Sequence, residues 1–187
     1  MKMSLFVLLF AFISSCGNTN EAAKPSEPTV QEAPAETPPA QQGMIVGKFT
    51  KEDLQKEPYA SWFNSGFESF DPADEAMETI KNNISEYEIV LFMGTWCPDS
   101  RREVPKLLKI LDEANYDLSN LTMIGVDRSK TTPEKLEAEY DLERVPTIIF
   151  IKDGKEVNRF VEYAKESIEA DIAKIVSGEE YTHAYSN

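Results

Sequence analysis

The spacing of apolar and polar residues divides this 187-residue chain into three parts. A short apolar run at residues 5–13 opens the chain, and residues 18–42 carry almost no strongly apolar side chain. From Met44 onward, apolar positions recur with the spacings typical of helices and strands. We therefore expect one folded domain, residues 44–187, preceded by two segments that lie outside its core.

Within that domain, continuous apolar runs predict strands buried on both faces of a sheet at 89–93, 121–126 and 147–151. The pair Asp153-Gly154 predicts a tight turn into a half-buried, alternating strand at 157–161. Helical spacing of apolar residues predicts helices at 72–84, 98–111, 133–140 and 167–176. Strands and helices in this order imply an α/β fold with a mixed sheet and helices on both faces.

Two features near the start of the domain refine this reading. Thr50 with Asp53 three residues later is typical of a capped short helix, which Pro58 would end. A cluster of aromatic residues follows around Gly66, and we interpret it as part of the core and its wall. Its members are Tyr59, Trp62, Phe63, Phe67 and Phe70.

The first fifteen residues are typical of an export signal, because Lys2 precedes a short apolar run and small residues follow it. Nine apolar residues are too few to span a bilayer as a helix. The sequence Ile13-Ser14-Ser15-Cys16 resembles the bacterial lipobox, in which the cysteine is acylated and becomes the first mature residue. The alternatives are an ordinary signal peptide with an incidental cysteine, or an uncleaved anchor.

Residues 16–43 are then expected to be the lipidated Cys16 and a disordered tether rich in Pro, Ala and Glu. The expected location is extracytoplasmic, on a bacterial membrane to which the lipid holds the protein. A formal net charge of −14 makes nucleic acid an improbable partner and leaves membrane attachment to the lipid.

The candidate chemistry lies at the turn between the strand at 89–93 and the helix that follows. Cys97 stands at the predicted start of that helix, where unpaired backbone N–H groups and the helix dipole stabilise a thiolate. Pro98 suits the first helical turn, because its missing N–H has no partner there. Arg101 and Arg102 add positive potential, and Asp99 opposes it.

Two motifs together resemble the thioredoxin superfamily: Trp96-Cys97-Pro98-Asp99-Ser100 after a strand, and Val145-Pro146-Thr147 before another. The resemblance covers roughly residues 70–178. It implies the three-layer thioredoxin-like sandwich, a cis peptide bond before Pro146 and a substrate groove beside Val145. It also implies that Trp96 shields one side of the thiol.

The sequence departs from the family pattern at two positions. Ser100 stands where a dithiol member has its second cysteine, and Leu91 stands where many members have a buried acid. With Cys16 expected to be lipidated, no internal disulfide is available to Cys97. Ser100 would either hydrogen-bond the thiolate or be only a first-turn polar residue.

These observations favour a monothiol protein that exchanges disulfides with protein thiols or small thiols through Cys97. The alternative is a redox-inactive binding module that captures partners in the groove at Pro146. No cofactor is implied. The single histidine, His183, has no cysteine or carboxylate at a metal-ligand spacing, so no metal site is expected.

Overall fold

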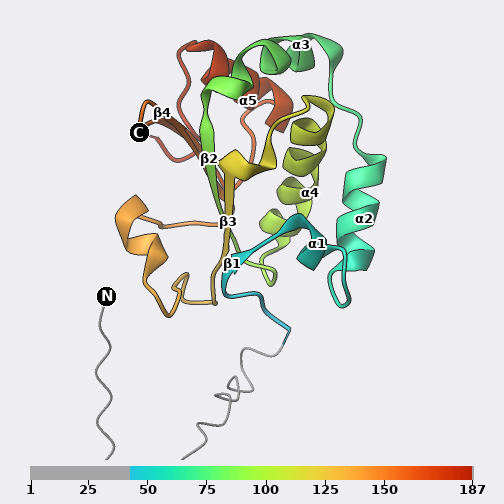
Figure 1. Cartoon of the computed structure of the whole chain (residues 1–187), viewed down its shortest axis with the longest axis vertical. Helices are drawn as coiled ribbons and strands as arrows, with labels where there is room; N and C mark the ends of the chain where they lie inside the picture. The colour runs from blue at the N-terminus through green and yellow to red at the C-terminus, as the bar shows by residue number, and fades with distance from the viewer. Residues whose placement is uncertain (1–42, 187) are drawn as a thin grey trace, which may run out of the picture. The chain divides into compact units, whose positions relative to one another are not determined.

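The computed structural model describes residues 43–186, which contain a five-stranded mixed sheet of order β1-β3-β2-β4-β5 (Figure 1). Strand β2 pairs parallel with β3, and all the other neighbouring pairs are antiparallel. The strands are β1 Gly47–Phe49, β2 Glu88–Met93, β3 Leu121–Gly125, β4 Thr147–Lys152 and β5 Lys155–Val161. The predictions for the export signal, Cys16 and the tether fall outside the described residues, apart from Gly43.

The described part of the chain also contains five α-helices and three 3-10 helices. Local signals set several of their ends: Thr50 and Asp53 form the predicted capping box of α1, Ser167 caps α5 and Gly178 ends it at φ 77°. The α-helices are α1 Lys51–Leu54, α2 Ala60–Ser69, α3 Asp74–Asn83, α4 Pro98–Glu113 and α5 Ile168–Ser177. The 3-10 helices are η2 Ile84–Glu86, η3 Leu118–Asn120 and η4 Leu136–Tyr140.

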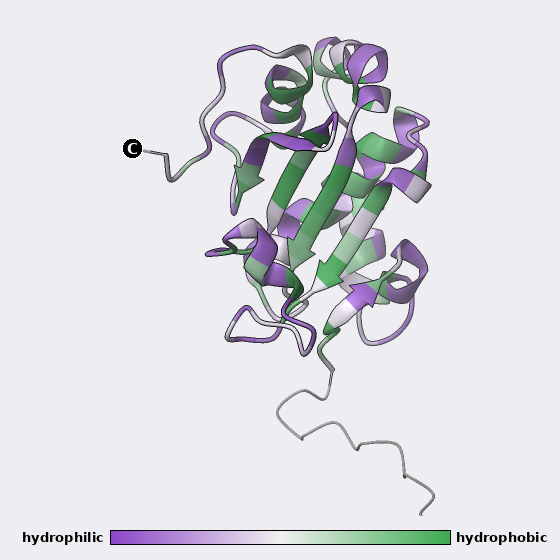
Figure 2. Ribbon diagram, turned by 60° about the vertical axis from the view of Figure 1, so that its left-hand side comes forward, coloured by the Kyte–Doolittle hydropathy of each residue, from purple (hydrophilic) through white to green (hydrophobic). Residues whose placement is uncertain are grey.

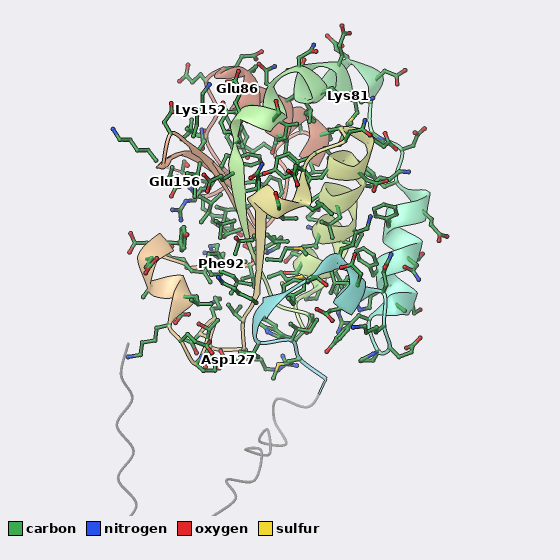
Figure 3. The ribbon with its side chains drawn as sticks, viewed as in Figure 1. Lys81, Glu86, Phe92, Asp127, Lys152 and Glu156 are labelled. Carbon is green, nitrogen blue, oxygen red and sulfur yellow. The ribbon has the colours of Figure 1, made fainter. Side chains whose placement is uncertain are left out.

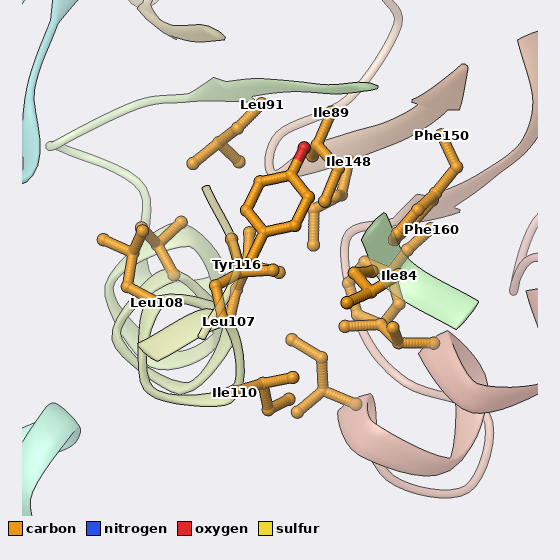
Figure 4. Packing of buried hydrophobic residues seen from close by; sticks show 14 of the residues in the cluster. Ile84, Ile89, Leu91, Leu107, Leu108, Ile110, Tyr116, Ile148, Phe150 and Phe160 are labelled. Carbon is orange, nitrogen blue, oxygen red and sulfur yellow. The ribbon is translucent and has the colours of Figure 1, made fainter. Parts of the chain in front are cut away.

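Strand β2 sends alternate side chains to opposite faces of the sheet. Ile89, Leu91 and Met93 lie in a large apolar cluster with side chains from all five α-helices. Figure 4 shows part of this cluster, and Figure 2 shows the apolar middle of the sheet. We call this large apolar cluster the helical-face core. Each fully buried Leu, Ile or Phe there stabilises the fold by roughly 1.5–3 kcal/mol.

The other face of the sheet carries a much smaller cluster, which we call the thiol-face core. Its buried members are Val90, Phe92, Cys97, Ile124, Val126, Val145 and Ile149. The segment that contains η4 covers it, with the ring of Tyr140 packed 5.3 Å from that of Phe92. The sheet therefore has a helical layer on each face, and the predicted three-layer α/β architecture is confirmed.

One predicted helix is only partly present. The helix expected at 133–140 is a 3-10 helix over Leu136–Tyr140. Lys135 has a left-handed conformation, φ 56°, which a continuous α-helix does not permit. The hydroxyl of Thr132 accepts from the backbone N–H of Leu136 and so starts the helix late.

The strand predicted at 157–161 exists, but its alternation is interrupted. A register shift pairs Phe150 with Asn158 and Ile151 with Glu156, which leaves Val157 between them as an extra residue. Val157 is consequently exposed, whereas Phe160 is fully buried.

Strand β1 was not predicted, because Gly47-Lys48-Phe49 is too short to show a period of two. The aromatic cluster at 59–70 forms core and wall as expected: Phe63 is fully buried, and the other rings pack against the helical-face core. No helix within residues 43–186 is both long and apolar enough to cross a membrane.

Candidate functional site

Cys97 lies where β2 turns into α4. It is the N-cap residue of α4, with extended backbone angles, and Pro98 is the first helical residue, as the sequence predicts. The Cys97 N–H donates to the carbonyl of Gly94 at 2.9 Å, and the Arg101 N–H donates to the carbonyl of Cys97 at 3.1 Å. These two bonds fix the thiol at the helix N-terminus.

The thiol of Cys97 reaches across the thiol face to the loop before β4. Its Sγ donates to the carbonyl oxygen of Val145 at 3.2 Å, and the residue is only 6% exposed. The peptide bond between Val145 and Pro146 is cis, which confirms that prediction. The structure thus brings together the two motifs that lie 48 residues apart in the sequence.

Ser100 is fully buried one helical turn after Cys97. Its hydroxyl accepts from the backbone N–H of Gly94 at 3.2 Å and makes no hydrogen bond to Cys97. The hydroxyl therefore binds the loop that carries the thiol, and a hydrogen bond from Ser100 to the Cys97 thiolate stays a prediction. The Ser100 hydroxyl satisfies a buried N–H of that loop.

Trp96 is half-buried beside the thiol, and its indole N–H donates to the carbonyl of Val126 at 3.0 Å. The ring lies so close over Gly94 that a Cβ there would be 2.6 Å from Trp96 Cε2. Sequence reasoning missed this requirement for glycine. A glycine at the end of a buried strand, immediately before the chemical motif, was the available signal.

The two arginines near the start of α4 differ in how far acidic side chains compensate their charge. Arg102 pairs with Asp99 at 2.7 Å and with the buried Glu103 at 2.5 Å, so its charge is largely compensated. Asp99 thus opposes Arg102, as the sequence predicts, and Glu103 adds to that opposition. Arg101 instead donates from Nε to the carbonyl of Thr95 at 2.5 Å and forms no ion pair within residues 43–186.

A polar rim beside the cis peptide bond was not predicted. The N–H of Glu162 donates to the carbonyl of Pro146 at 2.7 Å, and its carboxylate accepts from Arg144 at 3.4 Å and from the hydroxyl of Tyr185. This hydrogen bond to Glu162 raises the pKa of Tyr185 to about 12. The Arg144 guanidinium lies over the Tyr185 ring, 3.8 Å from its centre. The centres of the Tyr185 and Tyr163 rings are 5.7 Å apart. We call these four side chains the cis-proline rim.

A cavity of about 370 Å³ adjoins the cis-proline rim, and His183 is one of the residues that line it. Burial and the nearby Arg159 lower the pKa of His183, so it is neutral near pH 7. No group of three or more His, Cys, Asp or Glu residues in the described part of the chain could hold a metal ion.

Comparisons with known proteins agree on one family. The family model described as Thioredoxin matches residues 72–174. Thioredoxin H-type 1 of Nicotiana tabacum is 33% identical over 103 residues, 54% of this chain and 77% of the relative. A thioredoxin of Chlamydia trachomatis is 32% identical over 73 residues, 39% of this chain and 66% of its own length. The crystal structure of Fasciola hepatica thioredoxin is 27% identical, with a TM-score of 0.37 over 55% of this chain and 89% of that one.

Proposed function

Because this chain belongs to the thioredoxin family and has its thiol–disulfide oxidoreductase-like function, we propose that it works with a single thiol. In this proposal Cys97 is the nucleophile, Trp96 and Pro98 shape its surroundings, and Val145 with Pro146 holds the client. The observation that carries the proposal is the thiol at the α4 N-cap, beside a cis-proline and with Ser100 one turn later.

The exchange reaction uses no second cysteine of this domain. The Cys97 thiolate attacks one sulfur of a client disulfide, the client's S–S bond breaks, and its other sulfur leaves as a thiolate. The product is a mixed disulfide between Cys97 and the client. A second thiol of the client, or a small thiol, must then attack this disulfide and regenerate the Cys97 thiolate. No net oxidation occurs when the client resolves its own adduct, which makes the reaction an isomerisation.

The hydrogen bond between Cys97 and Val145 couples ionisation to client binding. A protonated thiol donates to the Val145 carbonyl, but a thiolate has no proton to donate. Ionisation therefore frees this carbonyl to accept from a backbone N–H of an extended client segment. Sulfur activation and the opening of the client's docking position then occur together.

The fate of the adduct tests the single-thiol mechanism. In cells quenched with acid and alkylated, the native protein should migrate partly as adducts that collapse on reduction and are absent from Cys97→Ser. Ser100→Cys should shorten their lifetime and should gain insulin reduction, because Cys-Pro-Asp-Cys spans one helical turn. Ser100→Ala is the matched control and should keep the adducts. Native insulin reduction equal to that of Ser100→Cys would contradict the proposal.

The proposal has a second part, which is location. Cys16 carries the lipid, and the domain works outside the cytoplasm on a bacterial membrane. The support is the lipobox-like Ile13-Ser14-Ser15-Cys16. Labelled fatty acid should enter the native protein but not Cys16→Ala, and equal labelling of Cys97→Ala would show that the label is at Cys16. Labelling that survives Cys16→Ala would overturn this part.

One observation favours a second candidate, a redox-inactive binding module. Cys97 is nearly buried and its thiol is engaged with Val145. In that case Cys97→Ser should retain every partner of the native protein in non-reducing co-purification. Loss of those partners in Cys97→Ser supports exchange.

A further inference from the structure

The arginines of this acidic chain have an unusual distribution. The chain has five arginines and a net charge of −14, and all five lie between residues 101 and 159. Three of them are compensated: Arg102 by Asp99, Arg144 by Glu162 and Arg159 by Glu156. Arg101 and Arg128 form no ion pair within residues 43–186, although acids greatly outnumber bases.

Arg101 is held beside the thiol turn. It is exposed, and its Nε donates to the carbonyl of Thr95, two residues before Cys97. Its guanidinium lies 5.8 Å from the ring centre of Trp62. Within residues 43–186 only Nε is engaged, so the terminal nitrogens can bind a carboxylate in the two-pronged manner typical of arginine.

Arg128 approaches the same turn from the loop after β3. It is exposed, and its guanidinium lies 5.5 Å from the ring centre of Trp96, the residue next to Cys97. Trp62 packs against the helical-face core and Trp96 against the thiol-face core. Arg101 therefore contacts a tryptophan on the helical side of the sheet, and Arg128 contacts one on the thiol side.

We propose that Arg101 and Arg128 select clients whose reactive cysteine is flanked by Asp or Glu in an extended polypeptide. This inference rests on the proposed exchange function. Stacking on the tryptophans limits the freedom of both guanidinium groups, so less entropy is lost when each binds a carboxylate. The domain's acidity would otherwise repel such a client, and two local cations offset that repulsion where the sulfurs meet.

The test compares three short peptides that differ only beside one cysteine: Ser-Asp-Cys-Asp-Ser, Ser-Asn-Cys-Asn-Ser and Ser-Lys-Cys-Lys-Ser. Each is supplied as its 2-thiopyridyl disulfide. The Cys97 thiolate attacks the peptide sulfur, and the leaving pyridine-2-thiolate is protonated to the absorbing thiopyridone. The full-length protein is used, reaction at Cys16 is subtracted with Cys97→Ser, and mass spectrometry confirms the adduct.

At low ionic strength the aspartate peptide should react roughly tenfold faster than the lysine peptide, and the ratio should fall as salt is added. Arg101→Gln with Arg128→Gln should bring the ratio to within about twofold, and each rate is divided by that of the asparagine peptide so that any change in the reactivity of Cys97 itself cancels. The matched control is Lys81→Gln with Lys155→Gln, which removes the same charge from two exposed residues that form no ion pair with any described residue. Lys81 lies at the opposite end of the molecule from Asp127, the neighbour of Arg128 (Figure 3).

The outcomes separate this inference from the function on which it rests. No reaction of Cys97 with any peptide overturns the exchange function itself. Equal rates for the three peptides, or an equal loss in the lysine control, overturn the selection by Arg101 and Arg128 and leave the exchange function standing. A further comparison uses two small disulfides, the acidic oxidised glutathione and the basic cystamine. If Cys97 reacts faster with oxidised glutathione than with cystamine while the three peptides react at equal rates, the selection of polypeptide clients is also overturned.

Discussion

The two faces of the sheet use the same strands but bury very different amounts of apolar surface. On one face, five α-helices enclose the helical-face core. On the other, one short 3-10 segment covers a cluster of seven buried residues that includes Cys97. The thiol thus belongs to the thinly covered side of the sheet. The comparison indicates that the helical face supplies most of the stability and the thiol face supplies the chemistry.

Two adjacent isoleucines of β4 offer the sharpest test of this difference. Ile148 and Ile149 are both fully buried, but they belong to opposite faces. Ile148→Ala should lower the free energy of unfolding by about 4 kcal/mol and Ile149→Ala by about 2 kcal/mol, because the thin layer can close over a cavity more easily. Urea denaturation measures both. The exposed Val157→Ala should cost less than about 0.5 kcal/mol, and equal losses for the two isoleucines would contradict the comparison.

A smaller effect is expected at the glycine beneath the tryptophan. Gly94→Ala places a methyl group 2.6 Å from Trp96 Cε2, so the indole must move and its bond to Val126 must weaken. The expected cost is about 1–2 kcal/mol, with slower reaction of Cys97 with a peptide disulfide. The control is the same substitution in a Trp96→Ala background, where most of the cost should vanish. An unchanged cost there would show that the strain does not come from the ring.

The smallest expected effect is a loss of folding stability at alkaline pH, caused by two tyrosines of the helical face. Burial raises the pKa of Tyr116, and burial together with Asp171 raises the pKa of Tyr181. Tyrosines of the unfolded chain ionise near pH 10. Above that pH unfolding releases protons, so stability falls as pH rises toward the higher folded pKa values.

Tyr116→Phe and Tyr181→Phe should each make this alkaline decline shallower, whatever they cost at pH 8. Urea denaturation from pH 8 to pH 11 gives the slopes. Tyr163→Phe is the control, because Tyr163 is exposed and lies outside the helical-face core. A decline as steep in both variants as in the native protein would show that other groups cause it.

Much of the sheet and its helical side could be predicted, because the signals are local and periodic. Ile89 to Met93 form an unbroken apolar run, and Ser167 and Gly178 mark the two ends of α5. The thiol side was harder to predict. The segment after Thr132 depends on one hydroxyl and on a left-handed Lys135, neither of which alters the hydropathy pattern.

The candidate site was predictable only where its residues are close together in the sequence. Trp96-Cys97-Pro98 and Val145-Pro146 are motifs, and motifs can be recognised in a sequence. The rest of the site depends on contacts between distant segments, such as Arg144 with Tyr185 and Arg128 with Trp96. Nothing in the spacing of these residues shows that they meet. The hydrogen bond that the Gly94 N–H donates to the Ser100 hydroxyl was missed, because a serine in the first helical turn looks the same in the sequence whichever partner it binds.

The first described residues lie on the same side of the domain as the thiol. The N–H of Ile45 donates to the hydroxyl of Thr95 at 3.3 Å, and a Cβ on Gly125 would meet the carbonyl of Ile45 at 2.4 Å. The chain therefore begins its folded course beside the loop that carries Cys97. A client that reacts with Cys97 must therefore approach the domain at the end where residues 1–42 join it.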